Sequence, residues 1–282
     1  MHSSPFTPRL LPFFAFCLLS FSLFAGEDEP VRLKYESYSI GFGRGNVYDS
    51  YLSPLKYEGL NVGLLYEEME MLKWKDGNFS FQQQYSADLS QTQNPTATAS
   101  NLTLLAEGAY TVYYRFNLNE KFQVFAGPQA GILTGGIYNS RNQNNPMSLK
   151  LNLNLGLSGI AAYKLMIKSQ PVRFRYQVNL PVAGTLFAPQ FGQSYYFLSD
   201  NENIFFASSF HNHLAFKNIF SAELPLNWIT FRATCIHSFY QTKINHLLTQ
   251  CYSNTFYVGI SKNFYIIKAG KKDNKNHATI FK

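Results

Sequence analysis

The feature that most constrains this chain is a strict two-residue alternation of apolar and polar side chains. From Leu149 to Ser158 the sequence reads LKLNLNLGLS, with leucine at every odd position. The segments Phe79–Leu89, Leu102–Phe116 and Pro171–Val182 alternate in the same way. Because successive side chains of a strand point to opposite faces, each segment predicts a β-strand with one apolar and one polar face. We therefore expect an all-β fold.

Short and long polar connections alternate between the expected strands. The short ones are Trp74–Gly77, Asn117–Glu120, Lys168–Pro171 and Leu226–Trp228, and the long ones are Gly43–Lys56, Ser90–Asn101, Tyr138–Ser148, Gly184–Asn203 and Thr242–Asn254. Such a series joins about ten antiparallel strands, with roughly 12 as the alternative count. The pattern predicts a transmembrane up-and-down β-barrel over residues 27–267, with tyrosines such as Tyr35, Tyr38, Tyr113, Tyr114, Tyr257 and Tyr265 in its interfacial girdles.

The competing architecture is a soluble β-sandwich or lipocalin-like barrel, which would alternate just as well. The charge content argues against it, because only 15% of the residues are charged, whereas about a quarter is usual for a soluble domain. We therefore expect a protein of the outer membrane of a Gram-negative bacterium, with outer-membrane lipid as its surroundings. An extracellular ligand of unknown identity is the expected partner. No stripe of aromatic and basic residues indicates nucleic-acid binding.

The two ends of the chain read as an export signal and a basic tail. Leu11–Phe24 is an apolar run of 14 residues, followed by Ala25-Gly26 and then by three acidic residues. The run is too short for a membrane-spanning helix and predicts a secretory signal peptide over residues 1–25. Residues 268–282 hold five lysines and one aspartate. We expect a solvated, disordered tail there, the alternative being an arm for anionic lipid or cell wall.

Seven charged residues alternate with apolar neighbours on the expected strands, so a barrel would place them inside its lumen. They are Glu67, Glu107, Arg115, Arg173, Arg175, Glu223 and Arg232. If they pair, they fill the lumen and close the barrel; if they are hydrated and unpaired, they line a narrow pore that prefers anions. At about ten strands the closed form is favoured.

Signals for chemistry are weak. His211 and His213 are two residues apart, so a strand through both would point both imidazoles into the lumen. Such a pair is a weak candidate for a metal site or an acid–base group. Polar lining of the lumen is the favoured interpretation. Ser194 lacks the second glycine and the strand–helix context of a nucleophile elbow. Cys235 and Cys251 could form a disulfide in an oxidising compartment, but unpaired cysteines are favoured. No cofactor motif is present, and we expect neither a cofactor nor catalytic residues.

Three segments resemble a Bacteroidetes domain-of-unknown-function family, number 3316. They are YDSYLSPLKYEG (Tyr48–Gly59), FAPQFGQSYY (Phe187–Tyr196) and KINHLLTQCYSNTFYVGISKNF (Lys243–Phe264). The resemblance implies an outer-membrane barrel without an assigned activity. The family pattern ends near Phe264, whereas this chain continues to Lys282.

The sequence thus predicts a non-enzymatic outer-membrane barrel that has a structural or surface-binding role and a largely filled lumen. A narrow channel for small solutes is one alternative. A surface-facing hydrolase that acts on lipid or peptide is the other.

Overall fold

The computed structural model describes residues 32–73, 77–119, 121–167, 170–189, 204–226 and 229–266. The expected signal peptide, 1–25, and the expected tail, 268–282, lie outside these residues. Within the described ranges, no helix is long or apolar enough to cross a bilayer.

The described chain forms eleven strands. They are β1 (Arg32–Asp49), β2 (Tyr57–Leu72), β3 (Phe79–Gln93), β4 (Ser100–Asn117), β5 (Phe122–Asn139), β6 (Met147–Ile167), β7 (Gln170–Phe187), β8 (Phe205–Ser209), β9 (His213–Pro225), β10 (Thr230–Ile244) and β11 (Leu247–Ile266). The ends of β2, β4, β6 and β9 fall at the four expected short connections, of which residues 74–76, 120, 168–169 and 227–228 lie outside the described residues.

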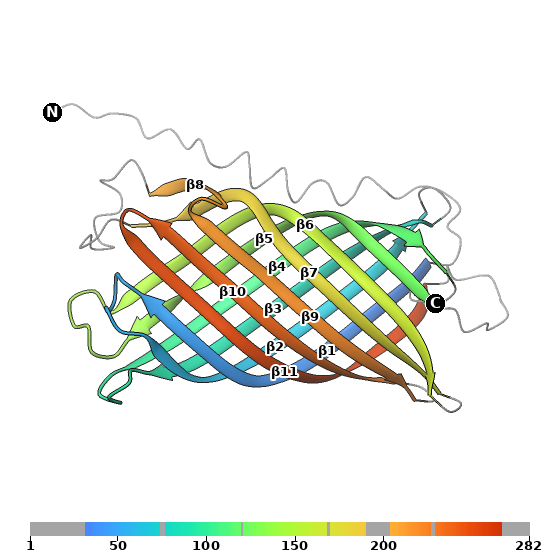
Figure 1. Ribbon diagram of the computed structural model, residues 1–282, viewed down its shortest axis with the longest axis horizontal. Coiled ribbons are helices and arrows are strands. Elements are labelled where there is room, and N and C mark those ends of the chain that lie inside the picture. Colours follow the sequence, from blue (N-terminus) through green and yellow to red (C-terminus); the bar gives the residue numbers. More distant parts are fainter. Residues whose placement is uncertain are drawn as a thin grey trace.

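Ten of the strands close into a single barrel of antiparallel neighbours (Figure 1). β1 pairs with β11 along its whole length, from Arg32 opposite Ile266 to Asp49 opposite Thr249. β6 pairs with β7, and β7 pairs with β9, which completes the ring. The short strand β8 is an addition that pairs only with the last five residues of β7. The prediction of about ten strands is therefore confirmed.

The two ends of the barrel differ in their connections. β1 begins and β11 ends at the same end, which we call the terminal end and which also carries the four short connections. The opposite end, which we call the loop end, carries the segments 50–56, 94–99 and 140–146, the turn at residues 245–246 and the short strand β8.

The polarity of the barrel is inverted relative to a soluble protein. Large apolar side chains point outward and are exposed, among them Ile40, Phe42, Leu64, Leu104, Leu153, Leu157, Phe220 and Phe256. Many polar side chains point inward and are buried, among them Asn61, Glu67, Gln82, Gln84, Asn152, Arg175, Gln177, Asn179 and Arg232. An apolar outer wall is what a hydrocarbon surrounding requires, and a closed ring leaves no backbone group without a partner.

Most of the expected long loops are shorter than predicted, because the strands continue beyond the apolar belt. Thr242–Asn254, expected as a loop, is the end of β10 and the start of β11 joined by Asn245 and His246 alone. These two residues have φ values of 52° and 62°, as the tight turn of a right-twisted hairpin requires. Likewise, β1 continues to Asp49, so the expected loop from Gly43 begins only after that residue.

The expected aromatic girdle is only partly correct. Tyr38 and Tyr114 point outward and are 55% and 38% exposed. Tyr35, Tyr113 and Tyr257 instead point into the lumen and are at most 1% exposed. Each of these three tyrosines is separated from the outward-pointing residues of its strand by an odd number of positions. Because successive side chains of a strand point to opposite faces, the three tyrosines point inward.

A charge in the middle of the outer wall is expected to destabilise the barrel. Leu157 lies in the middle of the outward leucine row of β6 and is 57% exposed. We expect Leu157→Arg to lower the free energy of unfolding by about 2–4 kcal/mol, because the guanidinium would lie in hydrocarbon. Urea unfolding of the protein folded into lipid vesicles measures this change.

Leu118→Arg is the matched control, since Leu118 is 63% exposed in the connection between β4 and β5. The control is expected to change the free energy of unfolding by less than about 0.5 kcal/mol. Equal losses in the two variants would contradict the placement of the apolar belt in the bilayer.

Candidate functional site

Ion pairs cross the lumen at the level of Glu67, a residue of β2. Arg232 of β10 places its Nη1 atom 2.7 Å from Glu67 Oε2, and Arg175 of β7 contacts Glu67 Oε1 through its own Nη1. All three residues are at most 1% exposed. Four strands separate β2 from β7 in either direction around the ring, so the pair between Glu67 and Arg175 joins opposite walls of the barrel.

A second carboxylate, Glu223 of β9, extends this cluster. Arg173 Nη1 lies 3.0 Å from Glu223 Oε2, and Arg232 Nε lies 3.9 Å from Oε1. The hydroxyl of Tyr35 donates a hydrogen bond of 2.5 Å to the same Oε1 and accepts one of 2.8 Å from Arg232 Nη1. We call the three arginines and two glutamates the cross-lumen network.

Neutral side chains continue the network toward β3, β4 and β6. Gln82 Nε2 donates to Glu67 Oε1 at 2.6 Å, and Gln177 Nε2 donates to Gln82 Oε1 at 3.1 Å. The Tyr113 hydroxyl donates to Gln82 Oε1 at 3.0 Å and lies 2.5 Å from Ser158 Oγ. Hydrogen bonds of this kind satisfy the lone pairs that a buried ion pair leaves, which is the condition under which such a pair is tolerated.

The structure brings together five of the seven expected lumen charges. Glu107 lies outside the cross-lumen network and instead accepts a hydrogen bond of 2.6 Å from Lys217 Nζ. Arg115 faces the lumen but does not join the network: its buried Nε atom has no hydrogen-bond partner among the described residues.

Sequence reasoning missed Lys217, Tyr35 and Tyr113 as parts of the lumen. Lys217 follows Ala215 and precedes Ile219 on the inward face of β9, and both of these neighbours are buried. The two tyrosines share the inward parity of their strands with Leu33 and Thr111. All three residues could have been predicted to line the lumen from their odd or even position in the alternation of each strand.

The expectation that His211 and His213 share the lumen face is wrong. His211 lies in the turn between β8 and β9, is exposed, and its Nδ1 lies 2.5 Å from Ser209 Oγ. His213 points inward, is 4% exposed, and has its Nε2 3.2 Å from Asn152 Nδ2. The strand begins only at His213, so the alternation does not extend to His211. Among the described residues, no group of three His, Cys, Asp or Glu residues could hold a metal ion.

The remaining chemical candidates are separated or lie outside the described residues. Cys235 is exposed on the outer wall and Cys251 is buried in the lumen, and both are free thiols. The expectation that they do not pair is confirmed. Ser194 lies outside the described residues.

Three apolar clusters line the lumen at successive levels. The first cluster lies near the terminal end and includes Tyr35, Met69, Tyr113, Phe125 and Ile160. The middle cluster consists of Leu65, Ile219, Ile236 and Tyr257. Near the loop end, a third cluster contains Val47, Tyr51, Leu52, Ile137, Ala215, Tyr240, Leu247 and Cys251. The lumen is therefore occupied by alternating apolar and polar layers of side chains.

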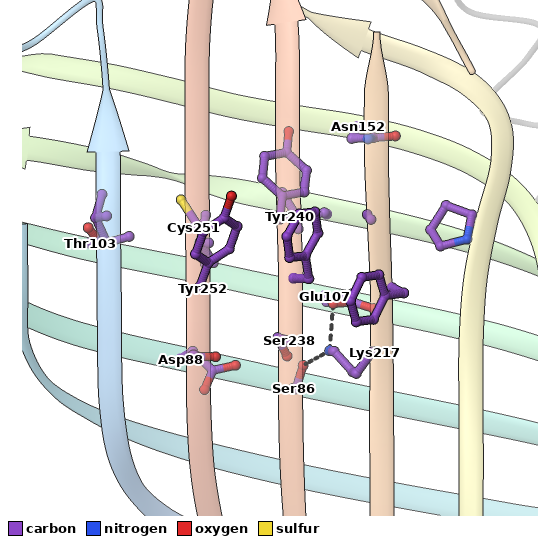
Figure 2. Close-up of a pocket in the computed structure, with 18 of the residues that line it drawn as sticks. Ser86, Asp88, Thr103, Glu107, Asn152, Lys217, Ser238, Tyr240, Cys251 and Tyr252 are labelled. Carbon is purple, nitrogen blue, oxygen red and sulfur yellow. Dashed lines mark hydrogen bonds and ion pairs between the residues drawn. The ribbon is translucent and has the colours of Figure 1, made fainter. Parts of the chain in front are cut away.

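Side chains do not fill all of the space between these layers, and we call the unfilled space described next the lumen cavity. It has a volume of about 90 Å³. Its lining includes Asp88, Thr103, Glu107, Asn152, Lys217 and Tyr240, which come from β3, β4, β6, β9 and β10. Figure 2 shows Lys217 directed toward Glu107 and Ser86.

A closed ten-stranded antiparallel barrel with an apolar outer wall and a polar interior defines a transmembrane β-barrel of the outer-membrane class. The chain belongs to the family described as "Protein of unknown function (DUF3316)", whose family model matches residues 12–272. The family expected from the sequence is thereby confirmed. No curated protein matches the chain.

Three solved structures are similar to this chain at low sequence identity. The transport unit of the autotransporter AIDA-I from Escherichia coli is 12% identical, with a TM-score of 0.46, and the match covers 93% of this chain and 100% of that one. The outer membrane protease OmpT from Escherichia coli is 8% identical, with a TM-score of 0.43 and coverage of 83% and 96%. An outer membrane channel from Pseudomonas putida F1 is 8% identical, with a TM-score of 0.36 and coverage of 84% and 97%.

Removal of the central carboxylate is expected to destabilise the barrel strongly. Glu67→Gln leaves Arg175 and Arg232 facing each other without their shared counter-charge. We expect the free energy of unfolding to fall by about 3–5 kcal/mol, the usual cost of breaking a buried pair. Urea unfolding in lipid vesicles measures this loss.

Glu58→Gln is the matched control, because Glu58 is an exposed residue of the same strand that accepts a hydrogen bond from Asn46. Its expected effect is within about 0.5 kcal/mol. If Glu67→Gln were as stable as this control, the cross-lumen network would contribute nothing to the fold.

Proposed function

We propose that this protein is a non-enzymatic outer-membrane barrel whose filled lumen makes it a rigid support for loops that bind at the cell surface. The observation that carries the proposal is the buried cross-lumen network, in which Arg175 and Arg232 share Glu67 across the barrel. Paired charges occupy the space that ions would need in an open pore. Apolar clusters on both sides of the network support the same conclusion.

Contacts among the loops at the loop end support a surface-binding role. Asn139 Oδ1 accepts hydrogen bonds of 3.0 Å from the backbone N–H groups of Arg141 and Asn142. Asn142 Nδ2 reaches the carbonyl oxygen of Leu52 at 3.3 Å, and Arg141 Nη1 reaches Thr98 Oγ1 at 3.3 Å. Three loops are thus connected, and connected loops lose less conformational entropy when they bind a partner.

Two alternatives have less support. The net charge of the network, three arginines against two glutamates, would favour anions if water entered the lumen. A hydrolase would need a nucleophile or an activated water beside a base. The separation of His211 from His213 supports a role without catalysis.

Electrical recording tests the filled lumen. We expect the wild-type protein to give no steady current in a planar lipid bilayer, because paired side chains and apolar clusters fill the lumen. The variant Arg175→Ala/Arg232→Ala removes two large side chains and leaves Glu67 to be hydrated, so we expect it to conduct. A steady, anion-selective current through the wild-type protein would instead support the narrow channel.

Chemical labelling tests the location and the orientation. In a Cys235→Ser background, which leaves only the buried Cys251 among the described residues, Asn144→Cys places a thiol in an exposed loop of the loop end. We expect a membrane-impermeant maleimide to label this thiol on intact cells. Leu118→Cys at the terminal end is the control and should react only after the outer membrane is opened. The reverse pattern would contradict the proposed orientation.

A further inference from the structure

The apolar part of the outer wall is short where the first and the last strand pair. On β1, the outward residues between Glu36 and Arg44 are Tyr38, Ile40 and Phe42. On β11, the outward residues between Asn254 and Lys262 are Phe256, Val258 and Ile260. We call the outward surface of the neighbouring strands β11, β1 and β2 the short face (Figure 1).

The register of the strands converts these positions into heights along the barrel axis. Following direct cross-strand partners once around the ring from Leu151 of β6 leads back to β6 at Tyr163, twelve residues nearer the terminal end. For a ring of ten strands, this stagger corresponds to a strand tilt of about 40°. Each residue therefore rises about 2.5 Å along the axis, and the distance from Glu36 to Arg44 is about 20 Å in height.

The wall on the opposite side of the barrel is different. β6 lies five strands from β1 in either direction around the ring. Its outward residues from Leu149 to Leu165 are leucines, a glycine, an alanine and a tyrosine, without a charged or amide side chain. This stretch rises about 40 Å along the axis, which exceeds the apolar band of about 25 Å that is usual for such barrels. The short face, at about 20 Å, does not reach that height.

Ion pairs fix the boundary of the short face toward the terminal end. Glu36 of β1 and Glu68 of β2 are direct cross-strand partners. Lys34 Nζ lies 2.8 Å from Glu36 Oε1 and 3.1 Å from Glu68 Oε1. The Tyr66 hydroxyl donates a hydrogen bond of 2.6 Å to Glu68 Oε2. Because these contacts hold both carboxylates against the wall, hydrocarbon at this height would surround charged groups, which is costly.

A row of polar side chains fixes the boundary toward the loop end. Successive cross-strand partners on β1, β11, β10 and β9 are Arg44, Asn254, His237 and Asn218. His237 Nδ1 lies 2.6 Å from Asn254 Oδ1, and the Tyr176 hydroxyl donates to Asn218 Oδ1 at 2.9 Å. Because the strands are tilted, this row descends toward the terminal end as it leaves β1. On β9 and β10 it therefore lies between apolar outward residues.

We propose that the short face keeps the surrounding bilayer thin, with a hydrocarbon layer of about 20 Å, whereas the opposite wall contacts a bilayer of ordinary thickness. Lipid at the short face has to end its apolar region between the two carboxylates, Glu36 and Glu68, and the polar row that begins at Arg44. A bilayer adapts to a wall that is too short by becoming thinner, at a modest cost for each ångström. The lipids that fit this face have short acyl chains.

Spin labels at equal heights on the two walls test the proposal. In a Cys235→Ser background, Phe42→Cys places a label on the short face. Cross-strand partners lead from Phe42 to Leu149 of β6. Since half a turn of the ring corresponds to half of the stagger, the residue of β6 at the height of Phe42 is Leu155, and Leu155→Cys is the matched control.

Electron paramagnetic resonance, with oxygen and a nickel chelate as relaxation agents, measures the depth of each label in the bilayer. In vesicles of dioleoylphosphatidylcholine, we expect the label at position 42 to lie about 3 Å or more closer to the bilayer surface than the label at position 155, because the hydrocarbon layer is thinner beside it. In vesicles of dilauroylphosphatidylcholine the two depths should be equal, since that bilayer already fits the short face.

Two variants locate the boundaries. Glu36→Leu/Arg44→Leu removes a polar group at each boundary of β1, so the difference in depth should fall by about half. Glu58→Gln, on the outward surface of β2, keeps a polar group and should leave the difference unchanged. Thermal unfolding shows whether each variant is folded, and the comparison of the two labels in the unaltered wall does not depend on either variant.

Equal depths of the two labels in dioleoylphosphatidylcholine would show a bilayer of uniform thickness and overturn the proposal. A label at position 42 that neither oxygen nor the nickel chelate reaches would show that protein, such as a second copy of the chain, covers the short face, and would overturn it as well. An undiminished difference in folded Glu36→Leu/Arg44→Leu would contradict the assigned boundaries. The inference goes beyond the proposed function, because no loop and no lumen group takes part in it.

Discussion

The constraint on which this structure depends is that every backbone N–H and C=O group in hydrocarbon must find a partner within the protein. The barrel meets it by pairing β1 with β11 over 18 residues of β1 and by joining β6 to β7. Closure leaves none of the ten ring strands at an edge, and it also decides the polarity of the two faces. The outer wall contacts lipid and must be apolar, so the polar half of each strand is turned inward.

A lumen lined in this way has to satisfy its polar groups in little water, and the barrel does so by placing opposite charges at the same level. Glu67 receives one arginine from β7 and another from β10. Glu223 receives Arg173 and the hydroxyl of Tyr35. Removing one partner leaves another charge buried, so the network is stabilising only as a unit. Apolar layers on both sides keep water away from it, and the lumen cavity is the level at which small side chains interrupt this filling.

The alternation of apolar and polar residues reports which face of a strand a side chain takes, and this explains how much of the fold and the site could be predicted. The period of two assigned most residues correctly to an inward or an outward face, which is why Glu67, Arg175 and Arg232 were expected in the lumen. Polarity also misled, because Arg44 and Asn46 look like loop residues although both are paired in β1. Outward polar residues mark where lipid ends, whereas strand pairing continues into water. Tyr35 was predicted on the wrong face for a related reason. An aromatic residue near a strand end is typical of an interfacial girdle, but the position of Tyr35 in the alternation of its strand places it inside the lumen.

The sequence by itself determined the all-β class, the approximate number of strands and the face that most side chains take. These properties depend on near neighbours in the chain, and alternation reports them directly. Only the tertiary structure decided which inward groups meet. Glu67 and Arg232 are 165 residues apart in sequence, and their contact depends on strand register and on the tilt with which the sheet closes. The lumen cavity depends in the same way on small residues of neighbouring strands, Ser238 and Ser253, lying side by side, which no local pattern encodes.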